Sequence, residues 1–239
     1  MADRCFCPDR PVEGRLVLEG DEARHLSRVR RIGVGEVVEV FDGKGFASRA
    51  RVEGAGKNRV ELTLLGDPIP DRVAPCRLTL ATAVPKGERF DWLIEKSTEL
   101  GVVRLVPLIT ERSVVDPRDA KLDRLRRLIV EASKQCGRNR LMDLDSPTPW
   151  TILASATAEG TRLLAHPGGL PASSYRSIRQ GDPVTLAIGP EGGFTESEVA
   201  IAVERGWQVV GLGATLLRIE TAGLAGSAAI LALCGSSER

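Results

Sequence analysis

Two loops near the end of the chain carry the residues whose types and spacing could bind a ligand. The first spans residues 188–195, reads IGPEGGFT, and follows an apolar run over residues 184–188. The second spans residues 211–222 and reads GLGATLLRIETA. A glycine has no Cβ, so its backbone can adopt positive φ and approach a ligand closely. Two such loops at neighbouring strand ends indicate a ligand site of the kind that open α/β sheets form.

The elements around these loops alternate between strands and helices. Apolar runs predict buried strands over residues 78–84, 103–109, 161–165, 184–188 and 208–212. Helices are predicted over residues 89–100, ended by Gly101, and over 122–135, 196–205 and 221–233. Thr195 with Glu198 forms a capping-box pattern, and Thr221 is the expected cap of the last helix. This alternation predicts an α/β domain with a mostly parallel sheet that helices cover on both faces.

Residues 1–70 follow a different pattern. Short runs of alternating polarity predict strands over 36–41 and 59–64, and the DGKG sequence at 42–45 is a strong turn signal. A short helix is predicted over 21–31, with Asp21 as its N-cap. Many short strands joined by turns predict a small β-barrel. A proline-rich linker covers 66–75, so we expect one domain over 1–70 and a second over 74–239.

Composition narrows the classes of function. The chain has 33 basic and 32 acidic residues, and a net charge of +1 excludes a uniformly basic surface. It has 2 histidines and 5 irregularly spaced cysteines, which favours reduced thiols over a disulfide framework or a metal site. No segment resembles a membrane span or a signal peptide. We therefore expect a cytoplasmic protein with neither a bound metal nor a membrane partner.

The order of the two loops, GPEGG and then LG-x(3)-LR-x-ETA, resembles the RsmE family of ribosomal RNA methyltransferases in the SPOUT superfamily. The resemblance covers nearly the whole chain. It departs after Arg138, where the family tends to have a proline and this chain has Leu141-Met142, which concerns the geometry of that loop more than the activity. The resemblance to the family also rests on features elsewhere in the chain. These are Arg4, Phe6, His25-Leu26, Val29-Arg30, the turn at 42–45, Lys86, the helix at 95–102, Glu131-Ala132, Gln135 and Arg138.

The resemblance implies both a fold and an activity. The fold would be a C-terminal SPOUT-type α/β domain with a trefoil knot, and an N-terminal PUA-like β-barrel that binds RNA. The activity would be methylation of uridine N3 in the 16S ribosomal RNA of the small ribosomal subunit, by a homodimer, with S-adenosylmethionine as methyl donor. The last helix is rich in small residues, so it would pack in the core or contribute to the dimer.

We expect S-adenosylmethionine to contact three strand ends and both loops. Backbone N–H groups exposed by the glycines would bind its polar parts, and leucine side chains would form an apolar slot. The alternative is that the glycines only make tight turns. The expected cofactor-binding residues are Ala165, His166, Ile188, Gly189, Pro190, Glu191, Gly192, Gly193, Leu212, Gly213, Leu216, Leu217, Arg218, Thr221 and Ala222.

Arg218 is the candidate catalytic residue, because an arginine can orient the cofactor or an RNA phosphate, or stabilise a uridine anion. The alternative is an ion pair with Glu220, which would contribute little if exposed. Glu191 and Glu220 are interpreted as fixing their loops, and a side chain at Gly193 should crowd the first loop. The sequence identifies no general base. The reaction as such requires no metal and no cysteine nucleophile.

Two clusters of basic residues could contact RNA. Arg24, Arg28 and Arg31 are spaced i, i+4, i+7 and would share one face of the first helix. A second stripe comprises Arg124, Arg127, Lys134 and Arg138. The alternative for both clusters is a solvated helix face. The expected RNA-binding residues are Arg24, Arg28, Arg30, Arg31, Lys86 and Arg138.

Three other functions stay open at this point. A methyltransferase of the same superfamily could act on another RNA, such as a tRNA nucleotide or a ribose 2′-OH. A non-catalytic RNA-binding factor could assist ribosome assembly, although the two intact loops argue against it. An α/β enzyme for a phosphate-bearing small molecule is disfavoured, because the chain has neither a Walker A motif nor a G-x-G-x-x-G sequence after its first strand.

Overall fold

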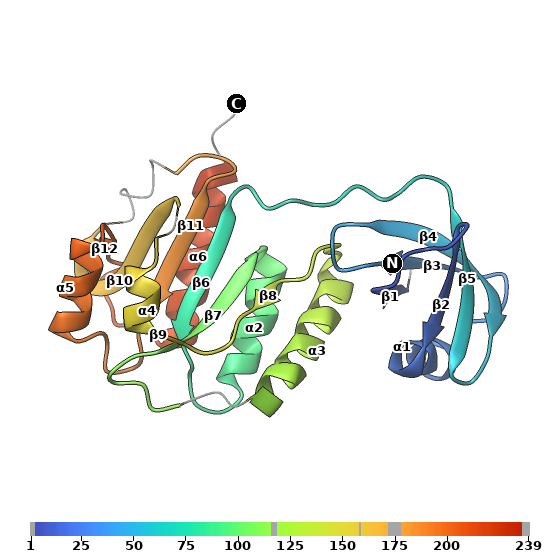
Figure 1. The fold of residues 1–239 in the computed structure, drawn as a ribbon, viewed down its shortest axis with the longest axis horizontal. Coiled ribbons are helices and arrows are strands. Elements are labelled where there is room, and N and C mark those ends of the chain that lie inside the picture. Colours follow the sequence, from blue (N-terminus) through green and yellow to red (C-terminus); the bar gives the residue numbers. More distant parts are fainter. Residues whose placement is uncertain (1–2, 116–118, 158, 172–177, 236–239) are drawn as a thin grey trace. The chain divides into compact units, whose positions relative to one another are not determined.

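The computed structural model describes residues 3–115, 119–157, 159–171 and 178–235 (Figure 1). The chain divides into two compact units, which are described one at a time. Unit 1 comprises Met1–Arg72 and Val130–Leu141, and unit 2 comprises Val73–Ile129 and Met142–Arg239. Residues 130–141, which the sequence assigns to the second domain, thus pack with the first unit.

Unit 1 is a curled five-stranded sheet with one short helical segment. The strand order is β1-β3-β4-β5-β2, with β1 parallel to β3 and the other pairs antiparallel. The strands are β1 (Arg4–Phe6), β2 (Arg15–Glu19), β3 (Val37–Phe41), β4 (Ala47–Ala55) and β5 (Arg59–Leu65). Alternation of buried and exposed residues along β2, β4 and β5 places one face of the sheet inside the unit.

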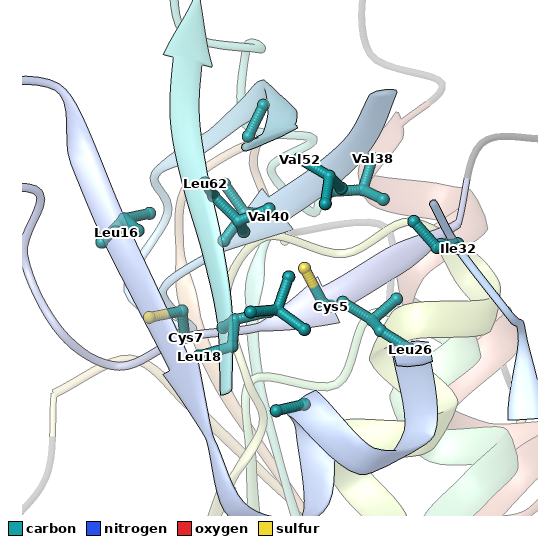
Figure 2. Packing of buried hydrophobic residues seen from close by; sticks show 13 residues of the cluster. Cys5, Cys7, Leu16, Leu18, Leu26, Ile32, Val38, Val40, Val52 and Leu62 are labelled. Atoms are coloured by element: carbon teal, nitrogen blue, oxygen red, sulfur yellow. The ribbon is translucent and has the colours of Figure 1, made fainter. Parts of the chain in front are cut away.

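The core of unit 1 is built from that inner face (Figure 2). Val38 and Val40 of β3 pack with Val52 of β4 and with Leu62 of β5, and Leu26 closes the cluster from the helical segment. Two cysteines also lie inside this core, Cys5 and Cys7. Burial raises the pKa of the Cys5 thiol far above its ordinary value, so this thiol is not poised to act as a nucleophile.

The first helix differs from its prediction. The structure has a short α1 (Gly20–Arg24) followed by a π-helical turn, η1 (His25–Val29), and the helix ends before Arg31. Its N-cap is Glu19, without a side-chain cap, so the predicted Asp21 cap is wrong. A π-helix has i→i+5 bonds, so the i, i+4, i+7 spacing of an α-helix does not hold across this turn.

A buried arginine joins residues 133–139 to the sheet of unit 1. Arg4 Nη1 donates to the carbonyls of Ser133 and Arg138 at 3.0 and 3.2 Å, and its Nη2 donates to Asn139 Oδ1 at 2.7 Å. Arg4 Nε lies 2.6 Å from a carboxylate oxygen of Glu39. A buried charge needs partners of this kind, and their number explains why this segment belongs to unit 1.

Unit 2 is an α/β domain with a six-strand path in the order β12-β10-β11-β6-β7-β8, in which β9 also pairs with β7. All of its strand pairs are parallel. The strands are β6 (Arg77–Ala83), β7 (Arg104–Ile109), β8 (Asp143–Leu144), β9 (Thr148–Pro149), β10 (Thr161–Leu170), β11 (Pro183–Ile188) and β12 (Gln208–Val210). The helices are α2 (Arg89–Leu100), α3 (Asp119–Cys136, which ends in unit 1), α4 (Trp150–Ser155), α5 (Glu196–Glu204) and α6 (Ile219–Gly235).

Helices cover both faces of this sheet, as the sequence predicts (Figure 1). On one face, Trp150 of α4 and Ala202 of α5 pack on Ala81 and Ala187 of the central strands. On the other face, Gly223 and Gly226 let α6 approach the sheet, because a Cβ there would meet the side chains of Leu80, Leu93, Leu186 and Leu212. Gly101 ends α2 in the left-handed conformation, which confirms its predicted position after the helix.

None of the helices in the described part of the chain combines the length and the apolarity that crossing a membrane requires.

Candidate functional site

Three neighbouring strands of unit 2 reach the same level of the sheet, where β11 and β12 end and β10 continues to Leu170. Ala165 of β10 pairs with Ile188 of β11 on one side and with Val210 of β12 on the other. Because the strands are parallel, the segments that follow all leave the sheet at its carboxyl edge. The structure thus brings together the three predicted strand ends, and Lys86 follows β6 at the same edge.

In the first loop, residues 189–195, different physical constraints favour glycine at different positions. Gly193 has φ +68° and closes a turn, since its N–H donates to Pro190 O at 2.8 Å. Gly189 has no room for a Cβ, which would lie 3.0 Å from the ring of Phe194. Nothing lies within 4 Å of a Cβ at Gly193, so a Cβ alone would not crowd the loop, and the constraint that the structure shows there is backbone strain.

The buried carboxylate of Glu198 fixes this loop from both sides. Its Oε2 accepts the N–H of Thr195 at 2.9 Å, and Thr195 Oγ1 accepts the N–H of Glu198, which confirms the predicted capping box. Its Oε1 accepts the N–H of Glu111 at 2.9 Å, from the segment that follows β7. The side chain therefore joins two segments at the carboxyl edge, and only the first of these bonds has a sequence signal.

Arg112 adds a second link between the same two segments. Its Nη1 donates to the carbonyl of Gly192 at 2.6 Å, and a Cβ at Gly192 would lie 3.2 Å from Arg112 Cδ. A short turn holds the segment itself, because Thr110 N–H donates to Ser113 Oγ at 2.9 Å. The sequence gives no signal for this contact, since it depends on the pairing of β7 with β6 and of β6 with β11.

The second loop borders a cavity of about 360 Å³. Gly169 and Pro171 at the end of β10, Gly211 to Gly213, and Ala225 and Ala229 of α6 line it. Leu212 and Gly213 were expected at the cofactor, and the other lining residues were missed. Gly169 passes so close to β12 that a Cβ would lie 2.4 Å from the Val210 carbonyl carbon, which only glycine allows. No residue of the first loop lines this cavity.

Residues 214–218 of the second loop are exposed. Leu216 is 85% exposed and Leu217 is 36% exposed, so in this chain alone they do not form the walls of a closed slot. Arg218 is exposed and forms no ion pair with a residue that the structure describes. Helix α6 starts at Ile219, so Thr221 lies inside the helix and its predicted role as the cap is wrong.

Glu220 is buried, with 6% of its surface exposed. Its Oε1 lies 3.8 Å from Nη1 of Arg89, at the start of α2, so the ion pair with Arg218 does not form. Its Oε2 is buried without a hydrogen-bond partner among the described residues. Such an atom needs a donor, because an unpaired buried carboxylate oxygen costs free energy.

Two other expected cofactor-binding residues lie on β10, at the level where β11 and β12 end. Ala165 and His166 are half-buried on β10, and His166 Nδ1 lies 2.7 Å from the carbonyl oxygen of Pro167. No group of acidic, histidine and cysteine side chains among the described residues is arranged to hold a metal ion. Burial and a hydrogen bond with Cys234 raise the pKa of Cys76 to about 12, so this thiol is a weak nucleophile near neutral pH.

The arginines of the first predicted RNA cluster fall into two groups. Arg24 forms an ion pair with Asp21, and Arg30 forms one with Asp3. Arg28 and Arg31 are exposed and form no ion pair with a described residue. The structure thus leaves two of these four side chains without an acidic partner.

Two residues of the second basic stripe, Arg124 and Lys134, form ion pairs, whereas Arg127 is exposed and forms no ion pair with a described residue. Arg124 pairs with Asp91 within unit 2. Lys134 lies within 3.0 Å of carboxylate oxygens of both Glu22 and Glu131, and its side chain is only 9% exposed. Arg138 is half-buried, and burial lowers the pKa of its guanidinium. The sequence could not predict the pairings of Arg124 with Asp91 and of Lys134 with Glu22, because these partners are far away along the chain.

Known proteins resemble this chain over nearly its whole length. Residues 72–231 match the model of an RNA methyltransferase domain, and residues 18–65 match that of an RNA methyltransferase PUA domain. Ribosomal RNA small subunit methyltransferase E of Synechocystis sp. is 32% identical, over 96% of this chain and 77% of that protein. The enzyme of that name from Bacillus subtilis is 31% identical, over 89% of this chain and 88% of its own.

A solved structure shares the fold. Ribosomal RNA small subunit methyltransferase E from Neisseria gonorrhoeae, bound to S-adenosyl methionine, is 33% identical and superposes with a TM-score of 0.86. The match covers 98% of this chain and 98% of the other. Together with the two domain models, it confirms the predicted fold class, a SPOUT-type α/β domain with a PUA-like barrel.

Replacing Glu198 by Gln should destabilise unit 2. An amide NH₂ would then face one of the N–H donors of Thr195 or Glu111, so one buried donor loses its acceptor. We expect the free energy of unfolding to fall by about 1–3 kcal/mol, measured by urea denaturation. Glu196→Gln is the matched control, because Glu196 is exposed on the same turn and makes no hydrogen bond with a described residue. Equal stability of the two variants would contradict the role given to Glu198.

Proposed function

The chain belongs to the ribosomal RNA small subunit methyltransferase E family, and from this premise we propose that it methylates N3 of a uridine in 16S ribosomal RNA, with S-adenosylmethionine as donor. The observation that carries the proposal is that β11 and β12 end at the same level of the sheet, on either side of Ala165 of β10. It puts both glycine loops of the family motif at one edge of the sheet.

The residues at this edge fit S-adenosylmethionine. The partnerless oxygen of Glu220 can accept a hydrogen bond from a donor, and the cofactor has an ammonium group and hydroxyls. The glycine backbone around the cavity allows close approach of a ligand. We propose that the cofactor is held by the predicted residues of both loops and of β10 and the start of α6, extended by Gly169, Gly211 and Glu220.

The chemistry depends on placement and charge. The bound cofactor supplies a methyl group that its sulfonium already makes electrophilic. The target nitrogen carries a proton at neutral pH, so the protein has to favour the uridine anion, whose charge spreads onto the carbonyl oxygens. We assign this role to Arg218, because its guanidinium is exposed beside the loop and has no acidic partner among the described residues. Glu198 and Arg112 hold the first loop to the segment after β7, and this rigidity helps to orient the cofactor toward the target nitrogen.

Unit 1 supports recognition of RNA, since residues 18–65 match the PUA domain of RNA methyltransferases. We propose that residues 1–70 bind the substrate and residues 74–239 bind the cofactor and transfer the methyl group. Arg28 and Arg31 are the best RNA contacts of the predicted first cluster, because Arg24 and Arg30 are already paired. A ribosomal RNA substrate is consistent with a cytoplasmic protein.

We also propose that the protein is a homodimer. Thr221, Ala225 and Leu233 form an exposed, mostly apolar strip on α6, and Leu216 and Leu217 are exposed just before the helix. A second copy could bury this surface, and the family resemblance points the same way. Small residues on a helix permit close approach of a partner.

The first test is methyl transfer itself. Purified protein is incubated with methyl-labelled S-adenosylmethionine and small ribosomal subunits that lack their modifications, and the nucleosides are then separated. We expect label in 3-methyluridine at one site of the 16S RNA. Label in another nucleoside would indicate a different RNA target. Cofactor binding without transfer to RNA would indicate a non-catalytic assembly factor.

Replacing Gly193 by Ala should weaken cofactor binding without a steric clash. A side chain at φ +68° costs about 1–2 kcal/mol, so the loop should relax away from its binding conformation. We expect the Kd for S-adenosylmethionine to rise by about 5- to 30-fold, measured by calorimetry. Gly33→Ala is the control, because Gly33 has ordinary φ and free space. An unchanged Kd in the Gly193 variant would remove the first loop from the cofactor site.

The proposed dimer can be tested by placing a charge on α6. Leu233 is 37% exposed, so Leu233→Glu should leave the fold intact but bury a carboxylate at a dimer interface. We expect sedimentation to give a dimer for the native protein and a monomer for the variant. A native monomer, or a variant that stays dimeric, would exclude this face as the interface.

A further inference from the structure

The outer face of the curled sheet in unit 1 carries arginines that no sequence pattern singled out. Arg49 and Arg51 are exposed on β4, where they alternate with the buried Ala50 and Val52. Arg15 is exposed at the start of β2, next to the buried Leu16. The strand register joins them, because Arg51 pairs with Thr63 of β5, and Thr63 pairs with Arg15.

These arginines therefore lie close together on one face. Neighbouring strands are about 4.8 Å apart, which puts the backbones of Arg15 and Arg51 about 10 Å apart across the sheet. Arg49 and Arg51 are about 7 Å apart along β4. The residue between Arg15 and Arg51 in the register is an uncharged threonine. We call Arg15, Arg49 and Arg51 the sheet arginines.

The sheet arginines have no acidic partner among the described residues, unlike many other arginines of this chain. Of the acids on the same face, Glu39 lies opposite Arg49 in the strand register but pairs with the buried Arg4, and Glu61 pairs with Arg59. Glu53 follows Arg51 by two positions on β4 and forms no ion pair with it. Three unpaired like charges so close together repel each other, and a polyanion would relieve this repulsion.

We propose that the sheet arginines bind the phosphate backbone of the RNA substrate. The inference rests on the proposed function, which supplies the class of partner. A guanidinium matches a phosphate with two parallel hydrogen bonds. Base stacking is disfavoured here, since none of the phenylalanines of unit 1, Phe6, Phe41 and Phe46, is exposed. Contacts of this kind position the RNA without reading its sequence.

The test compares two triple variants of equal charge. Arg15→Gln/Arg49→Gln/Arg51→Gln removes the sheet arginines. The control, Arg59→Gln/Arg104→Gln/Arg126→Gln, removes three exposed arginines that are already paired with Glu61, Asp145 and Asp123. The Kd of the full-length protein for a 16S RNA transcript is measured at several salt concentrations. S-adenosylmethionine affinity and thermal unfolding check that each variant is folded.

We expect the sheet-arginine variant to lower the slope of log Kd against log salt by about 2 to 3, which corresponds to the loss of three phosphate contacts. The Kd at moderate salt should rise on the order of tenfold. The control variant should keep the native slope. Equal slopes in the two variants would overturn the proposal. A variant that loses affinity for assembled subunits but not for the RNA transcript would also overturn it, because a ribosomal protein would then be the partner. Methyl transfer is measured separately. RNA binding that depends on the sheet arginines, without methyl transfer, would support this binding surface and contradict the proposed function.

Discussion

Parallel pairing of β10 with both of its neighbours is the constraint on which the site depends. Parallel strands need long connections, and each connection of unit 2 returns the chain to the opposite edge before the next strand begins. The loops that follow β10, β11 and β12 therefore have to meet at one edge, whatever their sequences are. Binding also requires that the loops hold one conformation. The buried carboxylate of Glu198 supplies the missing rigidity by accepting N–H groups from two segments.

Both faces of the sheet pack large side chains against small ones, but they use different residues. On one face, small strand residues such as Ala81 and Ala187 accommodate the aromatic rings of Trp150, Phe194 and Trp207. The rings of Trp150 and Phe194 lie 4.7 Å apart, so the first loop is packed into the core through Phe194. On the other face, the glycines of α6 meet leucines of the sheet and of α2. Large residues therefore pack on small ones on both faces, which lets the helices lie close to the sheet.

The sequence predicts what local patterns determine. Apolar runs in the sequence predict β6, β7 and β11, and the structure has strands there. The capping box of Thr195 is a short-range signal, which the structure also confirms. The start of α6 at Ile219 was missed, because Thr221 offers a hydroxyl at a cap-like position while the helix begins one half-turn earlier. The extension of β10 to Leu170 could not be foreseen, since residues 167–169 read as Pro-Gly-Gly. Partners that are far apart along the chain cannot be predicted from local patterns. Examples are the contacts of Arg4 with Asn139, of Arg89 with Glu220 and of Lys134 with Glu22.

Charge pairing explains how a nearly neutral chain can still bind a polyanion. Several acids that could neutralise the surface are already paired with arginines, such as Glu39 with Arg4 and Asp145 with Arg104. A paired arginine offers little to RNA, because binding would first have to separate it from its carboxylate. Exposed arginines without an acidic partner among the described residues then shape the local potential, although the net charge is only +1. A count of basic residues along a helix therefore overestimates the RNA-binding surface, whereas the strand register identifies arginines that have no acid to neutralise them.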